Sequence, residues 1–204
     1  MKISGAAPGK KGLTALYVDE KFQFSVDTGV YLDSGLRPGS AVTEEDLREL
    51  LGKSDSRRAE RKALRLLGMR SYSRAELERK LARSFPRAAA AHAVERMETL
   101  GFLNDREYAR SLAGKLFGEK HYGAGRVRLE LARRGISRET AEQAMEQSRP
   151  EDPGEGIRVI LERKYPGVLR SERDRRRAAA SLRRLGYGWE EIIGAFRKYA
   201  DKDE

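Results

Sequence analysis

The sequence has no cysteine and only two histidines, His92 and His121. Without cysteine the chain has no disulfide, no thiolate zinc site and no cysteine nucleophile. The two histidines lie on different parts of the chain, and neither has carboxylates at the spacing of a metal site. We therefore expect neither a metal nor a cofactor.

Aromatic residues are scarce at 7%, and long apolar runs are absent. No run approaches the roughly 20 apolar residues of a membrane-spanning helix. Residues 1–11 also lack the stretch of about 7–15 apolar residues that a signal peptide needs. Together these absences predict a cytoplasmic protein without a membrane partner.

Motifs for nucleotide chemistry are incomplete. Only three residues separate Gly5 from Gly9, where a phosphate-binding loop needs about four, and Lys11 stands where that loop needs a serine or threonine. The segment Gly123–Gly125 lacks the third glycine of a dinucleotide-binding turn. Most acidic residues stand within about four positions of an arginine or lysine, as in solvated helical ion pairs. We therefore expect no enzyme.

Basic residues are abundant instead. The chain has 42 Lys and Arg against 32 Asp and Glu, for a net charge of +10. Such a charge determines partners and solubility rather than fold. It favours nucleic acid, or an assembly that contains it, ahead of an anionic membrane surface.

The chain also repeats itself. Similar segments at Leu81–Arg83, Leu131–Arg133 and Leu182–Arg184 are 50 and 51 residues apart. A fixed period of this size indicates stacked copies of one supersecondary unit. Such arrays are elongated and present surfaces for binding rather than a catalytic pocket. A hydrophobic content of 39% suits thin three-helix units with small cores.

The first 52 residues have a different pattern. Residues 1–12 are rich in Gly, Lys, Ala and Pro and predict a flexible arm. Apolar and polar residues alternate over 13–26, which predicts a β-hairpin that turns at 19–21. The hairpin should pack on residues 30–36 or pair with a third strand near 40–42.

A short helix should follow this hairpin. Thr43 and Asp46 match a capping box, and Gly52 is expected to end the helix. Lys53–Ser56 would then be a polar hinge. The sequence thus predicts a small α+β module over 1–52.

Helix signals dominate the rest of the chain. Helices should begin after Ser73, Asn104 and Asp152, the last with Pro153 in its first position. We expect repeats over 53–103, 104–149 and 150–204, with helices near 57–69, 74–84, 87–100, 105–117, 123–134, 138–147, 153–164, 171–185 and 189–199. The predicted fold is mainly α: three tandem three-helix, helix-turn-helix-like repeats in an elongated array after the α+β module.

Arginines concentrate on the second helices of repeats two and three. Arginine has a planar fork suited to phosphate or carboxylate pairs, and such a helix gives nucleic acid a salt-dependent affinity. An acidic protein surface and a merely solvated face are the alternatives. The third helices carry several glutamates, so base-specific contact is not expected from them. The candidate binding residues are Lys120, Arg126, Arg128, Arg133, Arg134, Arg173, Arg176, Arg177, Arg183 and Arg184, with Arg170 on the same basic stretch.

Three segments carry a family resemblance. Residues 101–109 resemble the pattern G-F-[IL]-[DN]-D-x-x-[FY]-A, and residues 120–136 resemble K-x-x-G-x-x-[RK]-[IL] followed by L-x-x-[KR]-G-[IV]. Residues 70–81 resemble the first-repeat pattern of the same family, and 182–187 keep a looser form of it. Over about 57–199 the chain resembles RecX regulatory proteins, which modulate the RecA recombinase.

The resemblance implies a function that composition and spacing do not. It implies binding in the helical groove of the RecA–DNA filament and suppression of ATP hydrolysis, strand exchange and co-protease activity, which modulates recombinational DNA repair. RecA and single- and double-stranded DNA are the implied partners, and the polar surface favours a monomer. One alternative is a sequence-independent DNA-binding protein built of helix-turn-helix-like repeats. A scaffold that binds only protein is another.

Overall fold

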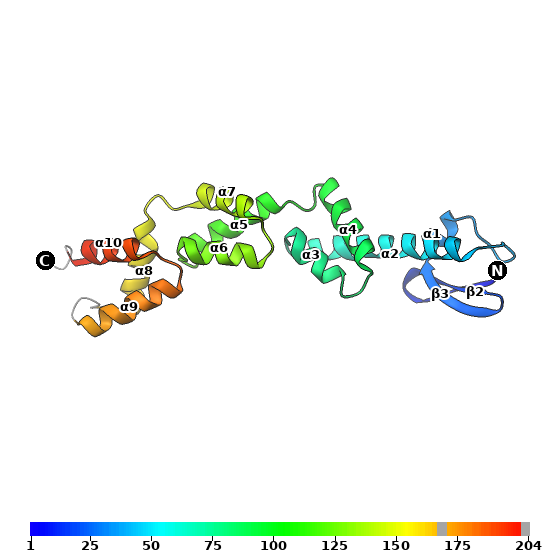
Figure 1. The fold of residues 1–204 in the computed structure, drawn as a ribbon, viewed down its shortest axis with the longest axis horizontal. Coiled ribbons are helices and arrows are strands. Elements are labelled where there is room, and N and C mark those ends of the chain that lie inside the picture. The colour runs from blue at the N-terminus through cyan, green and yellow to red at the C-terminus, as the bar shows by residue number, and fades with distance from the viewer. Residues whose placement is uncertain (167–170, 201–204) are drawn as a thin grey trace. The chain divides into compact units, whose positions relative to one another are not determined.

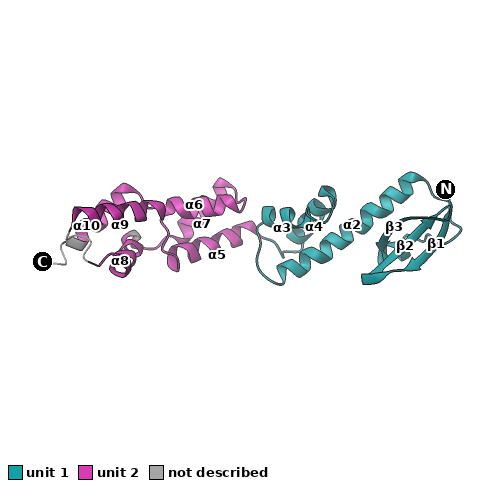
Figure 2. Cartoon of the chain, turned by 90° about the horizontal axis from the view of Figure 1, so that it is seen from below, with its two compact units in different colours: residues 1–103 teal, residues 104–204 magenta. Residues whose placement is uncertain are grey.

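The structure is a computed structural model that describes residues 1–166 and 171–200. The chain divides into two compact units, residues 1–103 and 104–204 (Figure 2). Arg170 lies outside the described residues. The predicted division into four modules stays a prediction.

Unit 1 begins with an antiparallel sheet of three strands, β1 (Ile3–Pro8), β2 (Leu13–Val18) and β3 (Lys21–Asp27), in the order β1-β2-β3 (Figure 1). The predicted hairpin is confirmed as β2 and β3. Asp19 and Glu20 form its turn with φ of 48° and 67°. Positive φ at both positions matches the twist of paired strands.

The prediction of a flexible arm over 1–12 is wrong, because β1 pairs along β2 and a 3-10 turn, η1 (Lys10–Gly12), joins the two strands. Ile3 is fully buried in a cluster with Val18 and Leu47. Small residues in β1 hide this strand from propensity, since its stability comes from backbone pairing and burial. The predicted third strand near 40–42 is only an isolated bridge between Lys2 and Ala41.

After the short helix α1 (Thr28–Asp33), α2 (Glu44–Leu67) runs without a break for 24 residues. Its predicted capping box is confirmed, since the Thr43 hydroxyl accepts from the Asp46 N–H and the Asp46 carboxylate from the Thr43 N–H. The expected end at Gly52 and the hinge at Lys53–Ser56 are wrong. A glycine in a helix costs only about 1 kcal/mol. Burial of helix residues before and after Gly52, such as Leu50 and Ser54, outweighs that cost.

A buried carboxylate joins the sheet to α2. Asp27, at the end of β3, is 1% exposed. Its N–H donates to the Ser54 hydroxyl at 2.8 Å, and its Oδ1 accepts from the Val30 N–H at 3.2 Å. Arg57 lies 3.7 Å from the same carboxylate, and Arg61 forms an ion pair with it. Because both arginines come from α2, the helix supplies the charge that the buried aspartate needs.

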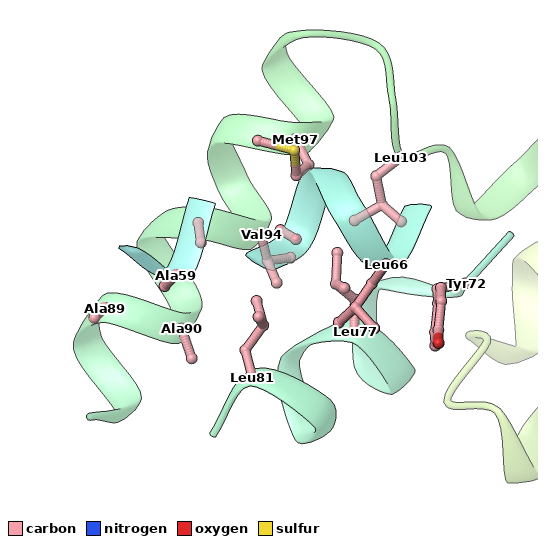
Figure 3. Packing of buried hydrophobic residues seen from close by; sticks show 12 residues of the cluster. Ala59, Leu66, Tyr72, Leu77, Leu81, Ala89, Ala90, Val94, Met97 and Leu103 are labelled. Atoms are coloured by element: carbon pink, nitrogen blue, oxygen red, sulfur yellow. The ribbon is translucent and has the colours of Figure 1, made fainter. Parts of the chain in front are cut away.

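The second half of α2 is the first helix of repeat one. It packs against α3 (Arg74–Leu81) and α4 (Arg87–Thr99), and Figure 3 shows their apolar side chains meeting in one cluster. Ala63 on α2 and Ala93 on α4 are fully buried, which lets the helices approach closely. The predicted cap at Ser73 is confirmed.

Unit 2 holds six helices within its described residues: α5 (Asp105–Gly118), α6 (Ala124–Arg133), α7 (Arg138–Ser148), α8 (Pro153–Lys164), α9 (Glu172–Arg184) and α10 (Trp189–Ala200). Each set of three surrounds its own apolar cluster. The predicted helix starts after Asn104 and Asp152 are confirmed by side-chain caps. The predicted fold class, mainly α with an N-terminal sheet and three-helix repeats, is confirmed.

Candidate nucleic-acid interface

One carboxylate gathers most of the basic residues of α6. Glu130 lies 2.8 Å from Arg126, 3.2 Å from Arg133 and 3.1 Å from Arg134. These partners stand four before, three after and four after Glu130, so all of them lie on its side of the helix. Burial raises the pKa of Glu130, but the Arg134 hydrogen bond and the nearby arginine charges outweigh burial and hold that pKa below its usual value.

The remaining arginine of α6 pairs with the neighbouring helix. Arg128 donates to Glu142 of α7 through Nε at 2.6 Å and Nη2 at 3.3 Å. This hydrogen bond lowers the pKa of the Glu142 carboxyl and raises that of the Arg128 guanidinium. The three predicted arginines of α6 and its C-cap residue Arg134 thus sit beside carboxylates. Lys120 is exposed in the turn before the helix.

The predicted residues of α9 divide into two groups. Arg173, Arg176 and Arg177 are exposed near the start of the helix, where Arg176 pairs with Glu172 at 3.1 Å. Arg183 and Arg184 stand at its end. Ala178 and Leu182 of the same helix are fully buried in the apolar cluster of repeat three.

Repeats two and three meet through backbone atoms. The Gly123 N–H donates to the Leu185 carbonyl at 2.8 Å, and the Gly125 N–H donates to the Gly186 carbonyl at 3.0 Å. A Cβ on Gly123 would lie 2.4 Å from the Gly186 carbonyl carbon, so only glycine fits there. We call these contacts the glycine junction; they place the start of α6 against the turn between α9 and α10.

A buried tyrosine reinforces the glycine junction. The Tyr187 hydroxyl donates to the His121 carbonyl at 2.9 Å. Burial, together with the charge of Glu191, raises the pKa of Tyr187 to about 12. A tyrosine with its ordinary pKa of 10 is already protonated at neutral pH, so the raised pKa extends this hydrogen bond into the alkaline range.

An open groove of about 750 Å³ lies over the glycine junction. Three predicted binding residues line it, namely Arg126, Arg183 and Arg184. The other seven candidates, Lys120, Arg128, Arg133, Arg134, Arg173, Arg176 and Arg177, are not among its lining residues. The structure thus brings α6 and the end of α9 together but leaves the first half of α9 apart from this groove.

Two residues of the groove, Arg149 and Trp189, are not predicted from the sequence. Arg149 follows α7 in a segment with no basic pattern. Trp189 stands three residues before the buried Ile192, a helical spacing that predicts burial of Trp189 as well. In the structure Trp189 is instead 56% exposed. The only sequence feature that distinguishes Trp189 is that it is the single tryptophan of the chain.

The part of the chain that the structure describes holds neither of two other kinds of site. No group of three or more His, Asp or Glu side chains there is placed to hold a metal ion. No helix within 1–166 and 171–200 has the length and apolar character to cross a membrane.

The chain is similar to curated proteins named regulatory protein RecX. The one from Trichlorobacter lovleyi is 37% identical over 141 residues, covering 67% of this chain and 92% of that protein. The one from Thermus thermophilus is 34% identical over 142 residues, covering 70% and 92%. The one from Deinococcus radiodurans is 32% identical over 168 residues, covering 81% and 76%.

Solved structures share the fold. A crystal structure of regulatory protein RecX matches with a TM-score of 0.71 at 20% identity, covering 100% of this chain and 99% of that one. RecX from Lactobacillus salivarius matches with a TM-score of 0.62 at 21% identity, covering 71% and 96%. Family models for the first and second three-helix domains of RecX match residues 59–97 and 104–145. The chain therefore belongs to the RecX family of regulatory proteins.

Proposed function

We propose that the protein binds the RecA recombinase and its DNA filament in the helical groove and inhibits ATP hydrolysis, strand exchange and co-protease activity. Family membership supports a regulatory role. The observation that carries a nucleic-acid contact is the set of exposed arginines on α9, of which Arg183 and Arg184 also line the groove over the glycine junction. A role of this kind needs a surface for binding and no catalytic residue.

The proposed contact residues are the ten basic residues predicted from the sequence, and we expect them to contribute in two ways. Arg173, Arg176 and Arg177 are exposed, so their charge is accessible to phosphate. Arg176 and Arg177 also pair within α9, with Glu172 at 3.1 Å and Asp174 at 4.0 Å. The arginines around Glu130 are held in fixed positions by that carboxylate. A phosphate must compete with Glu130 for these arginines. They should therefore favour an anion whose oxygens fit their geometry over one that offers only nonspecific negative charge.

Reversing the charge on α9 tests this proposal. The variant Arg173→Glu/Arg176→Glu/Arg177→Glu should bind the RecA–DNA filament more weakly, on the order of tenfold or more at low salt. Inhibition of RecA ATP hydrolysis should weaken with it, while circular dichroism stays unchanged because all three side chains are exposed.

A matched control separates this surface from net charge. Arg48, Lys53 and Arg65 are exposed on α2, so reversing them changes the charge of the chain by the same amount. That control should inhibit RecA like the original protein. Equal loss in both variants, or loss in neither, would contradict the assignment to α9.

The alternative is a sequence-independent DNA-binding protein, which the exposed arginines of α9 also favour. It would bind bare duplex as tightly as the filament, with a steep dependence on salt. Binding to DNA alone, RecA alone and the filament, each at two salt concentrations, separates the two functions. Preference for the filament together with loss of ATP hydrolysis supports the regulator. A separate measurement of the mass of the free protein tests the monomer expected from the sequence.

A further inference from the structure

We propose that the groove over the glycine junction binds a single DNA strand by stacking an unpaired base on Trp189. This inference rests on the proposed function for its choice of DNA as ligand. Trp189 is the first residue of α10 and is 56% exposed. Leu129 of α6, at 43% exposed, offers a second apolar surface within the same groove. An indole left in an open basic groove suits a flat aromatic ligand better than solvent.

One face of the indole already has a cationic neighbour. The Arg183 guanidinium lies 5.8 Å from the ring centroid. It is held there because it also donates to the Tyr187 carbonyl at 2.9 Å. A base stacked on the other face would complete a layer of guanidinium, indole and base, an arrangement that single-strand binding proteins use without regard to sequence.

The lining of the groove also carries positive charge for the phosphates beside that base. Arg149 and Arg184 both line the groove and are exposed. Neither has an ion-pair partner among the described residues, in contrast to Arg126, which pairs with Glu130. Glu190 and Glu191 also line the groove. Their charges repel phosphate, so the strand should follow the side where the arginines stand.

The floor of the groove is formed before any ligand arrives. The glycine junction fixes Gly125 and Gly186 through backbone hydrogen bonds. Gly188 is fixed as well, because its N–H donates to the Glu191 carboxylate at 2.6 Å. Without side chains at these glycines a strand can approach the backbone closely. A preformed floor also reduces the entropy lost on binding.

The combination of an exposed ring and unpaired arginines favours a single strand over other anions. In a duplex each base is covered by its neighbours, so its flat face cannot reach an indole. An acidic peptide would satisfy the arginines but would leave the indole face without a matching surface. Base stacking uses both features at once.

The tryptophan itself reports on the groove, because it is the only one in the chain. We would follow its fluorescence while adding oligothymidylate, an abasic strand of the same length, or a duplex. Oligothymidylate should quench the emission, and the abasic strand should leave it nearly unchanged despite its equal phosphate charge. Equal effects of the two strands would overturn the proposal.

Substitutions provide a second measurement that does not depend on fluorescence. Trp189→Ala should weaken binding of labelled oligothymidylate on the order of tenfold, as loss of one stacked base predicts. Trp189→Phe should retain most of the affinity, and the abasic strand should bind both variants equally. Phe22→Ala is the matched control, since Phe22 is 58% exposed on unit 1. Loss in the control equal to that in Trp189→Ala would also overturn the proposal.

The two proposals fail in different ways. If Trp189→Ala still inhibits RecA but binds both strands like the original protein, stacking is wrong and the proposed function stands. If the original protein binds neither RecA nor the filament, the proposed function is wrong whatever the groove binds. Quenching by RecA without DNA, with no quenching by oligothymidylate, would assign the groove to a protein partner and overturn stacking.

Discussion

Adding one methyl group at Gly186 should break the glycine junction. A Cβ on Gly186 would lie 2.1 Å from the Arg126 backbone nitrogen and 2.6 Å from the Arg126 Cβ. Backbone atoms cannot rotate away as the end of a side chain can, so the two segments must separate. The φ of Gly186 is +92°, a conformation that alanine adopts only under strain.

The cost follows from what the separation removes. The two backbone hydrogen bonds of the glycine junction contribute about 1 kcal/mol each. Strain at the positive φ adds about 1–3 kcal/mol if the turn keeps its shape. Gly186→Ala should therefore destabilise unit 2 by about 3–5 kcal/mol, enough to lower its melting temperature by roughly 10 °C or more.

Thermal unfolding by circular dichroism measures this loss, and hydrogen exchange locates it. Exchange at the Gly123 and Gly125 amides should become faster, because their acceptors move away. Gly114→Ala is the control, since Gly114 lies inside α5 with no atom within 4 Å of an added Cβ. It should stabilise the chain by about 1 kcal/mol. Unchanged melting and unchanged exchange in Gly186→Ala would refute the reasoning.

Three further predictions concern other contacts. Asp27→Ala should destabilise unit 1 by about 2–3 kcal/mol in urea unfolding, because the cap of α1 and the partner of two arginines disappear; a loss below about 0.5 kcal/mol would contradict that role. Gly52→Ala should stabilise the same unit by about 1 kcal/mol, since this exposed position is helical, and destabilisation would mean that α2 breaks there. Glu130 has a lowered pKa, so its contribution to stability is present above its ordinary value of 4.5 and is lost as the pH falls through the folded-state pKa. Glu130→Gln should accordingly reduce the loss of stability below about pH 4.5 in melts across pH, and an unchanged acid profile would contradict this assignment.

Local patterns predicted the helix starts well, because a cap is decided within four residues. Ser73 and Asn104 each accept from an N–H no more than three positions away. The same local rule failed at Gly52, where a stop signal was outweighed by Ser54 and Ala59 packing against residues far away in sequence. The prediction for β1 failed for a related reason. Pairing with β2, and not its own composition, makes this segment a strand.

The candidate site was predictable only in its charges. Counting arginines found α6 and α9, but no local pattern pairs Arg128 with Glu142, 14 positions away, or Gly123 with residues about 60 positions later. The groove exists because of that second contact. Its tryptophan could not be recognised, because helical spacing alone predicts a buried ring.

The uninterrupted course of α2 has a mechanical consequence. Over 24 residues the helix is about 36 Å long, with the sheet attached to its first half and repeat one to its second. Asp27 fastens the sheet to the middle of that rod. A force applied to repeat one is therefore transmitted to the sheet through a stiff lever, and residues 44–67 offer no joint at which the two could turn independently.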